Sequence, residues 1–346
     1  MCSASVPSAS ARPTGRVVLI GAVHEAQAVL AALLHSPLVR PVAVITPPDE
    51  ERRRLSGAAD LAGPAAAAGI PVLREGDVNR PEVVAFVRAL DPDLVVAVGW
   101  TRLLGRDLLS VPRHGCVGFH ASLLPQHRGR APVNWAILRG ETVTGNTMML
   151  LDPGADTGDI VDQRRVSIDP EDTCATVYER VARAGAEMLL AHLPALLTGN
   201  APRRPQDPAA GDVLPRRTPA MGVIDWDRPP RAVHDWVRAL TVPYPGAFGL
   251  LDGERVMVWR TRPPRREEPE GAPGLVLDVE PGGVRVAARG GSLLVTEMSG
   301  RGEPPQPAAS WARRAGLRPG ARFAAVPPEV ARWVLGHGPR PQEVAW

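Results

Sequence analysis

Two runs of aliphatic residues, each ending in glycine, constrain the fold of this chain more than any other feature. They read Arg16-Val-Val-Leu-Ile-Gly and Asp93-Leu-Val-Val-Ala-Val-Gly. A strand without polar alternation is buried on both faces, which is typical of a parallel sheet covered by helices. Further apolar strands are expected at 41–46 and 70–73, with helices at 25–35, 58–69 and 81–90. This alternation predicts a doubly wound, Rossmann-like, mostly parallel α/β sheet.

The second half of the chain follows a different pattern. A long helix is expected at 173–197, and the stretch after it is rich in Pro, Arg, Gly and Asp, as in a linker. Beyond residue 220, short strand patterns separated by Gly-containing turns favour a small antiparallel β-barrel of the OB-like kind. We therefore predict a disordered segment at 1–15, a catalytic domain at 16–199, a linker at 200–220, a barrel domain at 221–303, and a tail of unassigned role at 304–346.

The composition excludes several classes of chemistry. All 40 basic residues are Arg, so no Lys is present to form a Schiff base or to bind phosphate in a nucleotide-binding loop. Three scattered cysteines, Cys2, Cys116 and Cys174, are too few for a disulfide framework or a cysteine-rich zinc site. The sequence also has no stretch of about 18 uncharged apolar residues. We therefore expect a cytoplasmic protein with no metal site and no membrane partner.

One histidine and one aspartate follow neighbouring strand patterns. His120 ends an apolar strand at 117–120, and Asp156 lies in the acidic loop 152–159 that follows a second strand at 147–151. An imidazole titrates near neutral pH, and a nearby carboxylate would orient it for proton transfer. The residues alone also allow a structural histidine at a strand end, and an acidic loop that serves as a turn or a hard-cation site.

Several motifs resemble those of the 10-formyltetrahydrofolate-dependent formyltransferases, which include methionyl-tRNA, glycinamide ribonucleotide and sugar-amine formyltransferases. The resemblance covers about residues 16–300, and Asp156 follows His120 by 36 positions, a separation common in that family. It implies the formyltransferase fold, with 10-formyltetrahydrofolate as the co-substrate and a primary amine as the acceptor. The motifs are His120-Ala-Ser-Leu-Leu-Pro, Arg128-Gly129, Asp156-Thr-Gly-Asp, Ile224-Asp-Trp and Pro243-Tyr-Pro-Gly-Ala-Phe.

The resemblance also implies roles for individual residues. His120 would transfer a proton and stabilise the oxyanion, and Asp156 would orient His120 and help to deprotonate the attacking amine. The folate would lie between two loops that carry Val98, Gly99, Trp100, Leu103, Leu104, Asp152, Gly154 and Ala155. The acceptor would contact Ser122, His127, Arg128, Gly129 and Asn134.

The chain departs from the family pattern at Gly118. The family usually has Asn two positions before the catalytic His, and the loss of one oxyanion donor typically lowers the rate by ~10²–10³. Asn134, Asn146 and Thr101 are the candidate substitutes for that donor. The departure keeps open a second class of function, a folate-binding protein with lost or altered transfer activity, and also a hydrolase that passes the formyl group to water.

The acceptor is the least constrained part of the prediction. The stretch 128–145 resembles the sugar-nucleotide branch of the family, which favours a small-molecule amine, and the segment 46–57 lacks the basic loop of the tRNA enzymes. We interpret Arg52, Arg53 and Arg54 as a helix start that pairs with Glu50 and Glu51. A tRNA acceptor stays as the alternative, because a basic stripe could neutralise its phosphates. The pairs available for such a stripe are Arg203-Arg204, Arg216-Arg217, Arg265-Arg266 and Arg313-Arg314.

Overall fold

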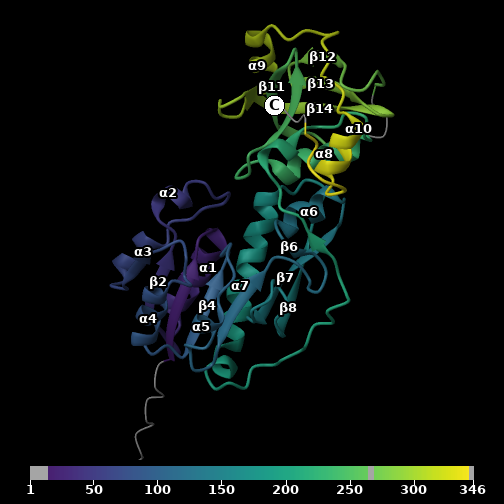
Figure 1. Cartoon of the computed structure of the whole chain (residues 1–346). Helices are drawn as coiled ribbons and strands as arrows, with labels where there is room; N and C mark the ends of the chain where they lie inside the picture. Colours follow the sequence, from purple (N-terminus) through teal and green to yellow (C-terminus); the bar gives the residue numbers. More distant parts are fainter. Residues whose placement is uncertain (1–14, 264–268, 343–346) are drawn as a thin grey trace, which may run out of the picture.

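The computed structural model describes residues 15–263 and 269–342 (Figure 1). The segment predicted to be disordered, 1–15, lies outside the described residues except for Gly15, which begins the first strand. Arg265-Arg266 also lie outside the described residues. No helix in 15–263 or 269–342 is long and apolar enough to cross a membrane.

A seven-stranded sheet forms the first half of the molecule. Strands β3, β2, β1, β4 and β5 are parallel, whereas β7 and β8 run antiparallel to their neighbours, so the predicted mostly parallel sheet is confirmed. In spatial order the strands are β3 (Val72–Arg74), β2 (Val39–Thr46), β1 (Gly15–Gly21), β4 (Leu94–Val98), β5 (Cys116–His120), β7 (Val143–Leu150) and β8 (Ile160–Ser167).

Helices cover both faces of this sheet, which explains the uninterrupted apolar strands. Val17 and Leu19 of β1 pack towards α1 (His24–His35) and α7 (Cys174–Leu196). Val18 and Ile20 pack in a separate cluster with α4 (Pro81–Ala89) and α5 (Arg106–Leu109). The short helices α2 (Asp49–Arg52) and α3 (Ala62–Ala67) lie between β2 and β3. The helix predicted at 58–69 is therefore shorter than expected.

The second sheet is antiparallel, as predicted. Its path is β10 (Ala247–Leu251), β11 (Glu254–Thr261), β14 (Gly291–Gly300), β13 (Gly283–Ala288) and β12 (Val276–Glu280), with β15 (Gln306–Pro307) on β14. Tail residues join the two ends of this path. Ala324 N–H donates to Leu250 O at 2.8 Å, and Phe323 N–H donates to Gly274 O at 2.9 Å. The tail thus completes the second sheet and continues through α9 (Ala308–Ala315) and α10 (Pro328–Val334).

One apolar cluster joins the two halves of the molecule. It contains α6 (Pro132–Leu138), the N-terminal half of α7, α8 (Pro230–Leu240) and the inner face of the second sheet. Trp236 and Phe248 are 3% and 1% exposed within this cluster. Because the cluster is continuous, the second sheet is packed against the first unit through α6 and α8. The domain limits 16–199 and 221–303 stay a prediction.

The predicted linker at 200–220, which we call the strap, is bound to the first unit along much of its length. It runs over the outside of the molecule (Figure 1). Arg204 and Ile160 exchange two backbone hydrogen bonds, of 2.9 and 3.0 Å. Further along, β9 (Val213–Leu214) pairs in parallel with β6 (Arg128–Gly129). The strap then enters the short 3-10 helix η1 (Pro219–Gly222).

Candidate functional site

His120 is the last residue of β5, and one of its two ring nitrogens is hydrogen-bonded within the protein. Nε2 lies 2.7 Å from the backbone carbonyl oxygen of His127. A carbonyl oxygen can only accept, so we assign the hydrogen of a neutral ring to Nε2. Nδ1 then faces Asp156, whose Oδ1 lies 3.5 Å away. His120 is 7% exposed, so little space is open to Nδ1 at the end of the strand.

The loop that carries Asp156 runs back along β5. At its start, Leu151 N–H donates to the carbonyl oxygen of Cys116, the first residue of β5, at 2.8 Å. Asp156 has a φ of +56°, an uncommon left-handed conformation that Asp tolerates better than most residues. Its Oδ2 accepts a hydrogen bond from Gly129 N–H at 2.9 Å. The structure thus brings the two predicted residues together, and their catalytic roles stay predictions.

Gln206 of the strap is a site residue that the sequence analysis missed. Its Nε2 donates to the carbonyl oxygens of Asp156 and Gly158, at 2.9 and 2.8 Å. Its Oε1 accepts from the Arg128 guanidinium at 2.9 Å. A glutamine in a Pro-rich stretch has no sequence signal that would separate it from an ordinary linker residue. Only the pairing of the strap with the first unit gives it this position.

Three residues predicted to contact the acceptor are buried and hydrogen-bonded within the protein, although Arg128 Nε has no partner among the described residues. Ser122 Oγ donates to Gln126 O at 2.7 Å and holds the turn after β5. Arg128 is 6% exposed and donates to Ala210 O at 2.9 Å as well as to Gln206. Asn134 is 0% exposed, and its Nδ2 donates to Ala239 O at 2.6 Å. Each of these side chains is thus hydrogen-bonded within the protein, and its contact with the acceptor stays a prediction.

Of the two remaining residues predicted to contact the acceptor, Gly129 binds Asp156 and His127 contacts charged side chains. Gly129 contributes its backbone N–H to Asp156, and a Cβ there would lie 2.5 Å from Leu214 O. With a φ of +100° the position requires glycine. Nε2 of His127 lies 3.2 Å from Glu141 Oε1 and 3.0 Å from the Arg139 guanidinium, so this nitrogen is engaged by side chains of the protein.

An ionised carboxylate anchors the loop on which His127 lies. Asp212 accepts from His127 N–H at 2.7 Å and from Arg139 at 2.8 Å. Burial opposes its ionisation, but the Arg139 side chain and the His127 N–H outweigh that effect and hold the pKa of Asp212 below its ordinary value. Asp212 therefore stays charged at neutral pH and fixes the carbonyl of His127 beside His120.

The predicted folate loop after β4 combines core residues with exposed ones. Val98 and Leu104 are 2% and 6% exposed, and their side chains pack in the core. Gly99 has a φ of +60°, and a Cβ there would meet Val23 Cγ2 at 2.0 Å. Leu103 is 53% exposed. Trp100 is half-buried, and its indole N–H lacks a hydrogen-bond partner among the residues that the structure describes.

The second predicted folate loop is a polar turn. Asp152 Oδ1 accepts from Gly154 N–H at 3.0 Å and from Thr157 Oγ1 at 2.7 Å. Gly154 and Ala155 are exposed. Leu151, which begins this loop, packs on the same apolar cluster as Trp100. The two loops therefore flank one cluster, as a site between them requires.

Leu151 also occupies the space next to Gly118. A Cβ on Gly118 would lie 2.5 Å from Leu151 Cδ2, so the strand has no room for a larger side chain at that position while Leu151 keeps its rotamer. Two of the three proposed substitutes for the missing donor are engaged elsewhere. Asn134 binds Ala239 O, and Asn146 Nδ2 donates to Val181 O of α7 at 2.8 Å. Thr101 is exposed, and its carbonyl accepts from Arg130 at 2.9 Å.

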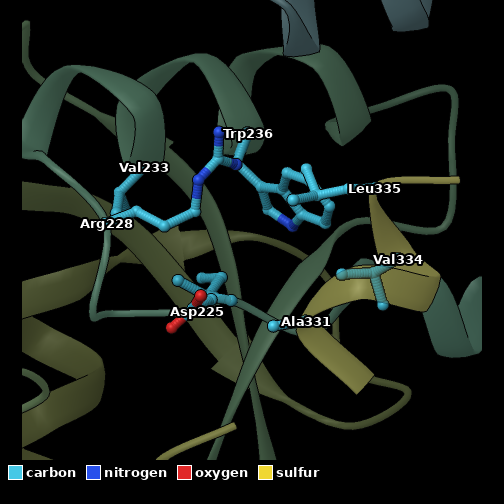
Figure 2. A pocket seen from close by; sticks show the side chains of 8 residues that line it. Asp225, Arg228, Val233, Trp236, Ala331, Val334 and Leu335 are labelled. Atoms are coloured by element: carbon cyan, nitrogen blue, oxygen red, sulfur yellow. The ribbon is translucent and has the colours of Figure 1, made fainter. Parts of the chain in front are cut away.

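The molecule also contains an enclosed cavity in its second half, which is too small for a ligand. Asp225, Arg228, Trp236 and residues of α10 line it (Figure 2). Its volume of about 10 Å³ is near the lower limit for a single water molecule. Over 15–263 and 269–342, no group of three or more His, Cys, Asp or Glu side chains could hold a metal ion.

Two family matches together cover most of this chain. Residues 15–193 match the formyl transferase family, and residues 216–316 match the formyl transferase C-terminal domain. The methionyl-tRNA formyltransferase of Geotalea daltonii is 40% identical over 286 residues, which cover 82% of this chain and 90% of that protein. That of Myxococcus xanthus is 37% identical over 312 residues, which cover 89% and 97%.

Solved structures share the fold at low sequence identity. HypX from Aquifex aeolicus in complex with tetrahydrofolic acid aligns with a TM-score of 0.60 and 20% identity, over 87% of this chain and 47% of that one. An N-formyltransferase from Helicobacter canadensis in complex with folinic acid and dTDP-3-aminofucose aligns with a TM-score of 0.61 and 16% identity, over 81% and 98%. From the sequence matches, together with this architecture, the chain belongs to the formyl transferase family.

Proposed function

We propose that this enzyme transfers the formyl group of 10-formyltetrahydrofolate to the α-amine of methionyl-tRNA. The observation that carries the proposal is the pairing of His120 Nδ1 with Asp156 Oδ1, 3.5 Å apart, in a chain of the formyl transferase family. The choice of acceptor is supported by curated relatives that bear the name methionyl-tRNA formyltransferase and align over most of their length. A cytoplasmic location stays a prediction.

The chemistry needs one proton to move twice. The amine lone pair attacks the formyl carbon, the C=O π electrons move to oxygen, and the amine gives its proton to the His120–Asp156 pair. Nδ1–H of the resulting imidazolium donates to the oxyanion, while Asp156 balances the ring's charge. When the intermediate collapses, the bond to N10 breaks, its electrons stay on N10, and the pair returns the proton there. The products are the formamide and tetrahydrofolate.

The loop after β4 offers suitable contacts for the donor. Leu103 presents an exposed apolar surface for a ring, whereas the Trp100 N–H, which has no partner among the described residues, is itself buried. The turn at 152–155 supplies exposed backbone groups on the other side. The folate-bound states of the two solved structures named above support this choice of donor.

An amino-sugar nucleotide is the second candidate acceptor, because the basic segment after β2 is largely neutralised. Arg54 pairs with Glu50 at 2.7 Å, and Arg52 pairs with Asp49 at 3.3 Å. Glu51 faces Arg102 at 3.8 Å rather than the helix start. A segment in which two of three arginines are already paired attracts RNA phosphates more weakly than one with three free cations.

The test is the release of tetrahydrofolate, followed by absorbance, with methionyl-tRNA, amino-sugar nucleotides or no amine. We expect release that requires methionyl-tRNA and falls at least ~10³-fold in His120→Ala and Asp156→Asn. His35→Ala, at the exposed end of α1, is the control variant.

The alternatives give distinct results in the same assay. If release of tetrahydrofolate requires an amino-sugar nucleotide, the acceptor is that nucleotide and not methionyl-tRNA. Release of tetrahydrofolate without any amine would identify a hydrolase. Folate binding without release under any condition would mean that Gly118 has disabled transfer and that the chain is a folate-binding protein.

A further inference from the structure

A concave site of about 580 Å³ lies on the outer edge of the seven-stranded sheet. Its walls are the turn 123–126 after β5, the edge strand β8 and the first residues of the strap, 202–204. The buried residues Leu124 and Ile160 form an apolar floor. None of the lining residues belongs to the catalytic or folate positions described above.

Three guanidinium groups surround this site, which we call the edge pocket. Arg165 and Arg203 are exposed, and within the described ranges their side chains have no ion pair and no hydrogen bond. The Arg204 guanidinium donates to one side chain, the neutral Gln163, whose Oε1 lies 2.6 Å away. The pocket therefore presents positive charge that the protein itself does not neutralise.

The carboxylate at the edge pocket is engaged by side chains outside the pocket. Asp162 Oδ2 lies 3.2 Å from His192 Nε2 of α7 and 3.3 Å from the Arg164 guanidinium. Neither His192 nor Arg164 lines the pocket. Asp162 therefore offsets little of the charge of Arg165 and Arg203.

The walls of the edge pocket are held together before any ligand binds. The two backbone hydrogen bonds between Arg204 and Ile160 fix the strap to β8. Gln163 Nε2 donates to Leu124 O at 2.7 Å and fixes the turn to β8. A preorganised site loses less conformational entropy when it binds.

From this arrangement we propose that the edge pocket binds phosphate groups of the formyl acceptor, through Arg165 and Arg203. Guanidinium groups suit phosphate because their planar donors match its oxygens. The inference rests on the proposed function only in that the ligand is the acceptor. Both candidate acceptors carry phosphate, as a phosphodiester backbone in tRNA and as a diphosphate in a sugar nucleotide.

The pocket lies close enough to the catalytic pair for one substrate to reach both. Gln206, which binds the Asp156 carbonyl, follows Arg204 by two residues, and two residues span at most about 7 Å. On the other wall, Leu124 follows His120 by four residues. A phosphate held at the rim would therefore hold the acceptor within reach of His120 without touching the reacting atoms.

The experiment compares Arg165→Gln/Arg203→Gln with Arg164→Gln, a neighbour on β8 whose guanidinium pairs with Asp162 outside the pocket. Binding of an RNA hairpin with the acceptor-stem sequence, and of inorganic pyrophosphate, is measured between 50 and about 200 mM salt. Formylation kinetics are measured with methionyl-tRNA and with amino-sugar nucleotides. We expect the double variant to raise KM about tenfold with kcat nearly unchanged, and Arg164→Gln to behave like the wild type.

The two ligand sources separate in this experiment. If the source is RNA, hairpin affinity falls about tenfold and the slope of log affinity against log salt falls by about two. If the source is a nucleotide diphosphate, pyrophosphate binding and the KM for the sugar nucleotide change instead. The proposal is overturned if the double variant binds both probes like the wild type, or if Arg164→Gln has the same effect as the double variant. Absence of methionyl-tRNA formylation alone would contradict the proposed function and leave the binding result standing.

Discussion

Two buried histidines lie beside carboxylates in this molecule, and only one of them keeps a nitrogen free. His234 of α8 has both ring nitrogens occupied, by Thr261 Oγ1 at 2.7 Å and by Pro170 O at 3.2 Å. Its neighbour Asp235 is held by Arg238 at 2.7 Å. His120 has one nitrogen occupied, and the other faces Asp156 without a hydrogen bond.

The comparison shows that burial does not distinguish the predicted catalytic histidine from a structural one. The two rings are 7% and 3% exposed, and each has an acidic neighbour. The difference is that His120 Nδ1 has no hydrogen-bond partner among the described residues, whereas both ring nitrogens of His234 have one. Buried polar atoms in folded proteins normally have a partner, so an unpartnered one is a candidate for binding a ligand. The predictions below use this difference, in order of decreasing effect.

The largest effect should separate the two histidines by activity. His120→Asn should lower kcat by about 10³ because the free nitrogen is lost. His234→Asn should leave kcat within about threefold of wild type, but it should destabilise the protein by about 1–3 kcal/mol, since it removes two buried hydrogen bonds. Steady-state kinetics and urea unfolding of both variants check this. Equal losses of activity in the two variants would contradict the distinction.

Removing the Arg238 guanidinium, which binds Asp235, should strongly destabilise the folded protein. Arg238 is 4% exposed and also donates to the carbonyl oxygens of Asp169 and Asp172, at 3.0 and 2.8 Å. Arg238→Met should destabilise the protein by about 3–5 kcal/mol, because Asp235 would keep a buried charge without that partner. Arg231→Gln, which removes the half-exposed partner of the same carboxylate, is the matched control, with an expected change below about 1 kcal/mol. Urea unfolding measures both changes.

The pH dependence of stability should report His234. Burial, aided by the charge of Arg238, lowers the pKa of His234 below its ordinary 6.5, although the carbonyl of Pro170 opposes this. Below pH 6.5 the unfolded chain binds a proton that the folded chain refuses, so stability falls as the pH falls from 6.5 toward the folded pKa. The slope for one proton is at most about 1.4 kcal/mol per pH unit. Urea midpoints from pH 5 to 8 should show this slope in the wild type and lose it in His234→Gln.

The smallest expected effect concerns the strand beside His120. Gly118→Ala places a methyl group 2.5 Å from Leu151 Cδ2, the end of a flexible side chain, and should cost about 1 kcal/mol of stability. Gly118→Ala/Leu151→Ala should recover part of that loss if the clash is its cause. Thermal or urea unfolding of the two variants, against Leu151→Ala alone, makes the comparison. A double variant less stable than the sum of the single changes would show that Leu151 has another role.

Much of the first unit could be predicted because its physics is local. Apolar runs at 16–21 and 93–98 identify strands buried on both faces. The 152–159 loop starts beside Cys116, at the opposite end of β5 from His120, because β7 is antiparallel to β5, and it runs back to place Asp156 beside His120. The internal hydrogen bonds of the predicted acceptor residues could not be predicted. Arg128 and Asn134 bind the backbone carbonyls of distant segments, at Ala210 and Ala239, whereas Ser122 binds Gln126 O within its own turn. No pattern along one chain states which distant carbonyl a side chain will meet.

The strap and the tail could not be predicted for the same reason. Residues 200–220 have a loop composition, yet β9 pairs with β6, and Gln206 binds the Asp156 loop. Likewise, 320–324 joins the ends of the second sheet without a strand pattern of its own. Such segments are ordered by hydrogen bonds to strands and loops elsewhere in the fold. Their own sequence therefore needs no strand or helix pattern, only a backbone whose N–H and C=O groups are free to form those bonds.

The strap has a consequence for the order in which the active site can form during synthesis. His127 receives a hydrogen-bond partner 85 positions later, at Asp212, and the Asp156 loop receives one 50 positions later, at Gln206. A nascent chain folds from its N-terminus as it leaves the ribosome. The seven-stranded sheet can therefore assemble while the proton-transfer pair still lacks its anchors. The hydrogen bonds that hold His127 and the Asp156 loop can form only after Asp212 has left the ribosome, as the polypeptide that will build the second sheet begins to appear.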